Sequence, residues 1–261
     1  MPELPEVETV RRTLLPRVVG RAVIGVQVRE TRLRRELTAD FAACLTGRTI
    51  VDVRRIGKYL LFDLDDQRVW LVHLGMTGCL AAGQTGDARH DHVGVELSDG
   101  TRLTYNDPRR FGLMQIVGQA PVEVAALGVD PLSAGYTSDY LREVCRGRVR
   151  PIKNVLMDQT MVAGLGNIYV SEILFRAAVR PSRRAGTLRR REIDAIQAAT
   201  GVILAEAIQM GGSSISDYRD GEGRPGYFQL RLDVYDRTDE PCDRCGTGNR
   251  ARVRSGRSSF Y

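Results

Sequence analysis

The feature that most constrains the fold is a change of hydrophobic spacing midway along the chain, near residues 128–133. Before it, short alternating or β-branched runs are divided by turn signals such as Ser98-Asp99-Gly100, which is typical of an antiparallel β-sandwich or barrel. After it, apolar residues recur at helical spacing, and Pro131 marks a linker. The predicted strands cover residues 22–28, 49–53, 59–64, 69–74, 92–97, 102–105 and 113–117.

Helices are expected at the start of the chain and throughout its second half. Residues 5–18 carry apolar side chains close to helical spacing, at Val7, Val10, Leu14 and Val18. The later helices are predicted over residues 138–145, 151–158, 167–177 and 187–210, with Asn167 as the N-cap of the third predicted later helix. Beyond them, residues 227–236 and 250–255 have strand-like spacing and could pair as a hairpin with a cysteine pair at its turn.

Charge and composition narrow the class of protein. The 261 residues suit two domains, or one with an appendage, and 43% hydrophobic residues indicate an ordered protein with a real core. The net charge of +6 is uneven, since Arg250, Arg252, Arg254 and Arg257 crowd the last residues. This favours a polyanionic partner about as much as a solvated basic face. An acidic start and the lack of a run of ~20 apolar residues predict a cytosolic protein.

The N-terminus carries a candidate nucleophile. Pro2 follows the initiator Met, and a small second residue normally allows Met1 to be removed, which would expose a secondary amine. Such an amine is partly unprotonated at neutral pH and forms a cationic iminium with an aldehyde-level carbon. Glu3 beside it and Glu6 one turn on suit acid and base work. Carboxylates at a helix N-terminus are also ordinary dipole complements, and on chemistry alone that second interpretation is favoured.

A glycine-rich turn offers a second candidate site. Gly164 to Asn167 open a predicted helix, whose free N–H groups would suit an anion. Lys153 and Arg148 nearby strengthen a phosphate-binding interpretation. A tight turn between two helices that needs glycine for its geometry explains the same residues equally well.

Blocks along the whole chain resemble the bacterial formamidopyrimidine-DNA glycosylase family, which removes oxidised purines such as 8-oxoguanine. They appear in the family's order and are more specific together than any one alone. The blocks are MPELPEVETVRR, GKYLLF, HLGMTG, HDHV, YNDPRRFG, LMDQTMVAGLGNIYVSE, GGSSISDY, GRPGYF and VYDRTDEPCDRCG.

The resemblance implies an α+β multidomain fold in three parts. Residues 1–132 would form an N-terminal catalytic β-sandwich domain that begins with a helix. Residues 133–225 would form a helix-two-turn-helix DNA-binding domain. Residues 226–261 would form a C-terminal zinc-finger hairpin, here incomplete.

The resemblance also assigns catalytic roles by motif. It implies that Pro2 attacks C1′ of the damaged nucleoside, that Glu3 is the acid assisting sugar opening and base release, and that Glu6 supports the site. Lys58 in the GKYL block falls on the lysine assigned to β-elimination, and Arg257 on the arginine that assists δ-elimination.

DNA contacts follow from the same motifs. The lesion must be flipped out of the duplex, and Met76, Arg109 and Phe111 match the side chains that fill the gap. Singly, Met76 and Phe111 would more often be core residues. The other implied contacts are His90, Arg109 and Arg148 with DNA, Lys153 and Asn167 with phosphate, and Ser214, Tyr218 and Arg224 in a loop over the flipped base. His73 and His92 are interpreted as structural or supporting residues.

The function implied is a monomeric, nucleoid-associated glycosylase and abasic-site lyase acting on double-stranded DNA. One alternative is a catalytically impaired protein that binds damaged DNA. Another is an endonuclease VIII-like glycosylase for oxidised pyrimidines, against which the PELPEVE block argues.

A pair of cysteines near the end of the sequence indicates part of a zinc site. Cys242 and Cys245 have the C-x2-C spacing of a zinc knuckle, and the family's finger continues with a spacer and two more cysteines, the first expected at position 262. We therefore expect a longer natural chain that binds one zinc, and poor zinc retention by the 261 residues given.

Overall fold

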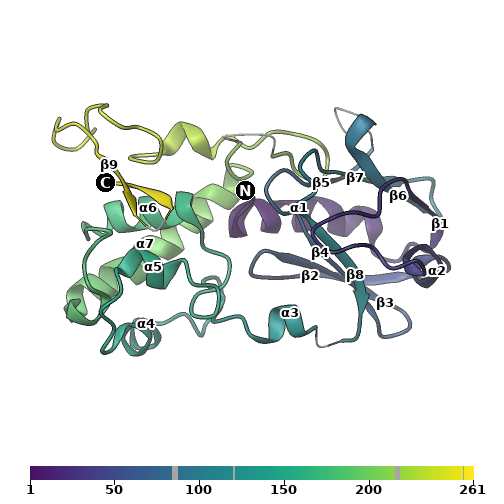
Figure 1. The fold of residues 1–261 in the computed structure, drawn as a ribbon, viewed down its shortest axis with the longest axis horizontal. Coiled ribbons are helices and arrows are strands. Elements are labelled where there is room, and N and C mark those ends of the chain that lie inside the picture. The colour runs from purple at the N-terminus through teal and green to yellow at the C-terminus, as the bar shows by residue number, and fades with distance from the viewer. Residues whose placement is uncertain (84–87, 120, 215–217, 255) are drawn as a thin grey trace. The chain divides into compact units, whose positions relative to one another are not determined.

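The computed structural model describes residues 1–83, 88–119, 121–214, 218–254 and 256–261 (Figure 1). The chain forms two compact units. Unit 1 comprises Met1–Ala125 and Ile208–Gln229, and unit 2 comprises Ala126–Ala207 and Leu230–Tyr261. Sequence indicated three parts. Contacts group the chain differently because the segment after the long helix packs in unit 1, whereas the C-terminal hairpin packs among the helices of unit 2.

Unit 1 contains two four-stranded antiparallel sheets and the N-terminal helix. One sheet has the strand order β1-β6-β7-β5 and the other has β2-β3-β4-β8. The elements are α1 (Leu4–Val18), β1 (Val23–Val28), α2 (Phe41–Leu45), β2 (Ile50–Ile56), β3 (Tyr59–Leu64), β4 (Val69–His73), β5 (Cys79–Ala82), η1 (Ala88–His90), β6 (Asp91–Leu97), β7 (Arg102–Asn106), β8 (Leu113–Val117) and α3 (Val122–Ala125).

The core of unit 1 is shared by both sheets and α1. Val7 and Leu14 of α1 pack with Trp70 of β4 and Val95 of β6 in one buried cluster, and Phe62 stacks on Trp70 with ring centroids 4.6 Å apart. The predicted N-terminal helix and all seven predicted strands are confirmed. Strand β5 was missed because it has four residues and no alternation, and its pairing with β7 is a long-range contact.

Unit 2 is helical and ends in a hairpin. Its elements are α4 (Ser138–Cys145), α5 (Ile152–Leu156), α6 (Asn167–Arg176), η2 (Ala185–Thr187), α7 (Arg190–Gln209), β9 (Ala251–Arg254) and β10 (Arg257–Phe260). The short helix η3 (Phe228–Arg231) contains the point in the chain where unit 1 ends, at Gln229, and unit 2 resumes, at Leu230. The predicted helices are confirmed, but the N-cap of α6 is Gly166 and Asn167 is its first residue. Among the described residues, no helix has the length and apolarity to cross a membrane.

The predicted pairing of residues 227–236 with 250–255 is wrong. β9 pairs with β10 instead, and residues 228–231 form a 3-10 helix. The cause is Glu172 of α6, which is buried and accepts backbone hydrogen bonds from Asp233, Val234 and Tyr235 at 2.8, 3.1 and 2.8 Å. These N–H groups are therefore used by a carboxylate instead of a neighbouring strand.

Candidate active site and nucleic-acid interface

The start of α1 is a buried cluster of Pro2, Glu3 and Glu6 next to an exposed Met1. Glu3 and Glu6 are only 3% and 1% exposed, whereas Met1 is 44% exposed. Glu3 is the N-cap and forms a reciprocal capping box with Glu6, whose Oε2 accepts from the Glu3 backbone N–H at 2.8 Å. The local sequence thus fixes both carboxylates in the capping box at the start of α1, one and four residues after Pro2 in the chain.

Glu6 also joins this cluster to the loop after α7. Its Oε1 accepts from the Ser213 N–H at 2.7 Å, and its backbone carbonyl accepts from the Tyr218 hydroxyl at 3.1 Å. Gly212, at φ +81°, lets the loop approach, since a Cβ there would lie 3.0 Å from Cγ of Glu6. Two parts of the candidate site that are far apart in sequence therefore meet at one carboxylate.

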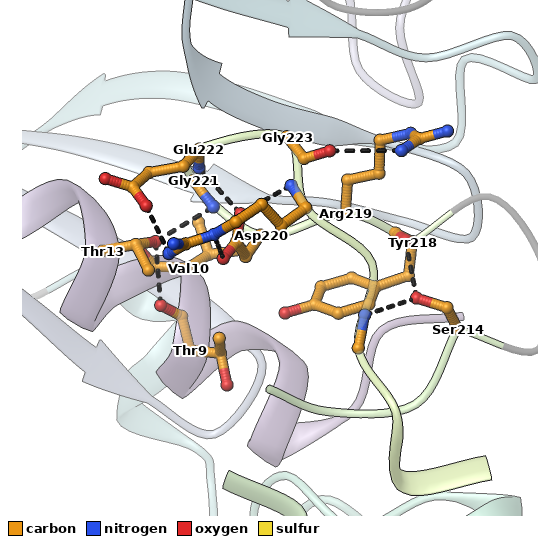
Figure 2. A network of polar contacts seen from close by, with 12 residues as sticks. Thr9, Val10, Thr13, Ser214, Tyr218, Arg219, Asp220, Gly221, Glu222 and Gly223 are labelled. Carbon is orange, nitrogen blue, oxygen red and sulfur yellow. Dashed lines mark hydrogen bonds and ion pairs between the residues drawn. The ribbon is translucent and has the colours of Figure 1, made fainter. Parts of the chain in front are cut away.

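The described residues of the loop from Ser213 to Tyr227 are held by contacts within the loop and by one contact to α1 (Figure 2). Ser214 Oγ donates to the Tyr218 carbonyl at 2.9 Å, and Gly221 N–H donates to Thr13 Oγ1 of α1, also at 2.9 Å. Arg224 pairs with Asp220 at 3.2 Å within the same turn. Residues 215–217, which belong to the loop expected to cover the flipped base, lie outside the described residues.

Burial strongly perturbs the Tyr218 phenol. It lies between the loop and α1, and burial, with the nearby charge of Glu6, raises its pKa well above the ordinary value. Tyr218 therefore stays a neutral hydrogen-bond donor.

Lys58 lies in the turn between β2 and β3 and is buried. Close to it, His73 at the end of β4 is cross-strand partner to Tyr59. Burial, followed by the charges of Arg34 and Lys58, lowers the pKa of His73 to about 3. Its Nδ1 accepts from the Gly75 N–H at 2.9 Å, so the neutral ring carries its proton on Nε2.

His73 was interpreted from the sequence as structural or supporting, but sequence reasoning did not place it beside Lys58. The signal was its pairing register with Tyr59, which brings it beside Lys58 and which no local pattern reveals. His92, by contrast, is buried, and its Nε2 lies 2.8 Å from the Asp107 carbonyl, which fits the structural role expected for it.

The three predicted gap-filling residues come from two adjoining loops, 74–78 and 107–112, which we call the wedge loops. Met76 and Phe111 are 39% and 41% exposed, which is unusual for large apolar side chains. The guanidinium of Arg109 lies over the Phe111 ring at 4.7 Å. The wedge loops touch, since a Cβ on Gly75 would lie 2.4 Å from the Phe111 carbonyl carbon. His90 is half-buried in η1, with its ring centroid 6.4 Å from that of His92.

Unit 2 holds the remaining predicted contacts. Lys153 is buried, and its Nζ donates to the Ser258 carbonyl at 2.5 Å and to Ser259 Oγ at 2.9 Å, which ties α5 to β10. Asn167 Oδ1 is buried without a hydrogen-bond partner in the described part of the chain. Arg148 is exposed, and its Nε donates to the Val144 carbonyl.

A basic cleft of about 450 Å³ opens beside Lys153. Arg180, Arg250 and Arg252 line it with Lys153, and the described residues around it include no Asp or Glu. Arg250 directly precedes β9 and exchanges backbone hydrogen bonds with Tyr261, so it extends the pairing of the hairpin, and side chains two positions apart in such a segment share a face. Four cationic residues around one hollow create a strong attraction for phosphate groups.

The hairpin tip and the cysteine pair complete unit 2. Arg257 is exposed at the start of β10, directly opposite Arg254, whose side chain is not described. Cys242 and Cys245 form a turn in which the Arg244 N–H points to Cys242 Sγ at 3.4 Å. Hydrogen bonding by Thr247 lowers the pKa of the Cys245 thiol, which favours a thiolate ligand.

The zinc expected at this turn is matched only in part. Two thiols are half of a four-coordinate structural site. Within the described ranges, no group of three or more His, Cys, Asp and Glu side chains could hold a metal ion.

The fold and the solved structures it resembles define the class of protein. The chain is similar to the MutM (Fpg) protein of Thermus thermophilus, with 39% identity, a TM-score of 0.90, and coverage of 100% of this chain and 97% of that one. It is also similar to a Lactococcus lactis Fpg solved with abasic-site DNA, with 35% identity, a TM-score of 0.89, and coverage of 99% and 97%. The class is that of DNA glycosylases built from a β-sandwich and a helix-two-turn-helix domain.

The particular family follows from sequence comparison. Residues 1–114 match the formamidopyrimidine-DNA glycosylase N-terminal domain, and residues 127–219 match the H2TH domain of the same family. Formamidopyrimidine-DNA glycosylases of Paracoccus denitrificans and Beijerinckia indica are 46% and 44% identical, with 100% of this chain and 98% of each relative covered. The chain belongs to the formamidopyrimidine-DNA glycosylase family of base-excision-repair enzymes.

Proposed function

We propose that this chain removes oxidised purines, such as 8-oxoguanine and formamidopyrimidines, from duplex DNA, and then cleaves the abasic product through an iminium on Pro2. Family membership supports the glycosylase activity. A mutant of Lactococcus lactis Fpg, at 35% identity, has been solved with Fapy-dG-containing DNA. The observation that carries the lyase step is the buried pair of Pro2 and Glu3 beside an exposed Met1, the residue whose removal frees the amine.

The chemistry begins at the Pro2 nitrogen. Its lone pair forms a bond to C1′ while the bond from C1′ to the base breaks, and the electron pair leaves with the base. The nitrogen loses its N–H proton, which balances the proton that the base takes up. Glu3 gives a proton to O4′ as the C1′–O4′ bond opens, which leaves a cationic iminium. Glu6 holds the Glu3 backbone in place through its 2.8 Å hydrogen bond.

Strand cleavage follows from the electron-withdrawing iminium. Loss of a proton from C2′ expels the 3′ phosphate, which is β-elimination, and a second loss at C4′ expels the 5′ phosphate, which is δ-elimination. Lys58 supplies a positive charge for the first elimination, with the Nε2–H of His73 as a neighbouring donor to a phosphate. Arg257 at the exposed hairpin tip assists the second elimination.

Access to C1′ requires the damaged nucleotide to leave the duplex, at a cost of a few kcal/mol. Met76 and Phe111 are exposed apolar side chains suited to enter between base steps, and Arg109 can hydrogen-bond the orphaned base. Ser214, Tyr218 and Arg224 belong to the loop that would cover the flipped base.

Unit 2 would grip the DNA backbone. His90 of unit 1 and Arg148 would add contacts to those of Asn167, Lys153 and the basic cleft. Cys242 and Cys245 would supply two of the zinc ligands expected for the family. We expect a cytoplasmic monomer that acts on nucleoid DNA.

Borohydride trapping on matched duplexes tests the proposal. Protein freed of Met1, as verified by intact mass, should become covalently linked to DNA that carries 8-oxoguanine, and protein that retains Met1 should not. Glu3→Gln should lose trapping on 8-oxoguanine but retain it on a preformed abasic site, because the abasic sugar has no base to release and already equilibrates with its open aldehyde, so it does not need the Glu3 proton at O4′.

Each contrary result identifies an alternative. Tight binding of lesion DNA without any adduct from the processed protein would indicate a non-catalytic damaged-DNA-binding protein. Faster excision of thymine glycol than of 8-oxoguanine would indicate the endonuclease VIII type.

A further inference from the structure

Asp107 is a fully buried carboxylate at the start of the second wedge loop. It is 0% exposed, and three donors use its two oxygens. Thr77 Oγ1 donates to Oδ1 at 2.6 Å, while the Tyr105 hydroxyl and the Gly112 N–H donate to Oδ2 at 2.9 and 2.8 Å. Charge-assisted hydrogen bonds of this kind are short and strong, and a buried carboxylate is costly when they are lost.

Two of the three donors to the Asp107 carboxylate, Thr77 and Gly112, adjoin residues proposed to contact DNA, whereas Tyr105 anchors the carboxylate from β7. Thr77 follows Met76 in the chain, and its Oγ1 also accepts the backbone N–H of Arg109 at 3.2 Å. Gly112 follows Phe111 directly. A fourth contact runs from the Asp107 backbone N–H to the His90 carbonyl at 3.1 Å.

We infer that Asp107 is a positioning residue that fixes the two wedge loops in one arrangement, so that Met76, Arg109 and Phe111 enter the duplex together. The inference rests on the proposed function, because it assumes that these three side chains fill the gap. Asp107 does not touch DNA itself, since it is completely buried. Its effect passes through Thr77 on one loop and Gly112 on the other.

The Thr77 hydroxyl is the most informative point of this arrangement. It donates to Asp107 and accepts from Arg109, so it connects both wedge loops through one atom. Thr77→Val keeps the shape and removes both hydrogen bonds, whereas Thr77→Ser keeps both. The pair therefore separates the hydrogen bonds from the packing of the side chain.

The test uses a duplex with 8-oxoguanine and with 2-aminopurine next to the opposite cytosine, so that insertion of the wedge residues changes the fluorescence. Single-turnover excision is measured on the same duplex. Met76→Ala establishes that the signal reports insertion. Val95→Ala, a core change in β6, serves as the control for a general loss of stability.

We expect Asp107→Asn and Thr77→Val to slow the fluorescence change and excision about tenfold, at a melting temperature no lower than that of Val95→Ala. Thr77→Ser should behave like the wild type. The inference is overturned if Thr77→Val and Asp107→Asn keep wild-type insertion and excision rates, or if Val95→Ala slows both equally. Failure of the wild-type protein itself to excise 8-oxoguanine would instead overturn the proposed function.

Discussion

The carboxylate of Glu6 accepts the backbone N–H of Ser213 at 2.7 Å, which joins the first turn of α1 to the loop after α7. Its other oxygen accepts the Glu3 N–H. One buried carboxylate therefore holds the backbone of Glu3 and also the first residue of the loop from Ser213 to Tyr227. A change of this carboxylate should therefore affect both parts of the site together.

Glu6→Gln places an amide NH2 against one of these two N–H donors. We expect a loss of about 1–3 kcal/mol in the free energy of unfolding, because a buried donor is left unpaired. Excision of 8-oxoguanine should slow at least tenfold. Urea unfolding and single-turnover excision are the measurements, and Glu96→Gln, which removes an exposed ion pair with Arg102, is the control with a change below about 1 kcal/mol. Equal effects of the two variants would contradict the linking role of Glu6.

Glu8 predicts a pH dependence of stability. Burial raises its pKa, but hydrogen bonds from Arg11 and Arg12 outweigh burial and lower the pKa from 4.5 to about 2. Because the folded-state pKa is depressed, the stabilisation is present above pH 4.5 and is lost as the pH falls through about 2. Thermal unfolding from pH 5 to pH 2 should thus have a shallower slope in Glu8→Gln than in the wild type. The same slope in both proteins would contradict the assignment.

The basic cleft predicts a change in the salt dependence of DNA binding. Arg250 and Arg252 line the cleft without a carboxylate among its described lining residues. Replacement of both by Ser should reduce the slope of log K against log salt by about one per arginine and weaken lesion and undamaged duplexes alike, because phosphate contacts carry no sequence information. Arg146→Ser removes the exposed arginine that caps the C-terminus of α4 and pairs with Glu143, and it is the control. An unchanged slope in the double variant would exclude the cleft from the interface.

Local patterns predicted most of the fold but few of its long-range contacts. Alternation identified seven strands of unit 1, and helical spacing identified α1 and the helices of unit 2, because both periods depend on neighbouring residues. The stretch 227–236 alternates like a strand. Its backbone is held in turns instead by Glu172, which lies 61 positions before Asp233 in the chain. Tertiary contacts thus override the local pattern.

The candidate site shows the same division. The closeness of Glu3 and Glu6 was predictable because they are one helical turn apart, whereas the catalytic roles of Pro2, Glu3 and Glu6 came only from the family resemblance. The link from Glu6 to Ser213 spans 207 positions and has no sequence signal. The position of His73 next to Lys58 was not predicted for a related reason, since only the register of β3 with β4 produces it.

Gly75 allows a test of how closely the wedge loops must approach. Gly75 and Gly100 both have positive φ, at +66° and +84°, so Ala should cost about 1 kcal/mol in backbone strain at either position. A Cβ on Gly75 would meet the Phe111 backbone at 2.4 Å, whereas one on Gly100 would meet nothing within 4 Å. We therefore expect Gly75→Ala to lose a further 1–3 kcal/mol or so through overpacking, as chemical unfolding would measure.

The same pair of variants also reports on function. Gly75 adjoins Met76, and the methyl group that Gly75→Ala adds would displace the Phe111 backbone. This variant should therefore impair excision of 8-oxoguanine. Gly100→Ala shares the backbone strain but lies in the turn between β6 and β7, so its excision rate should stay near that of the wild type. If the two variants lose equal stability and equal activity, the close approach of the wedge loops has no role in gap filling.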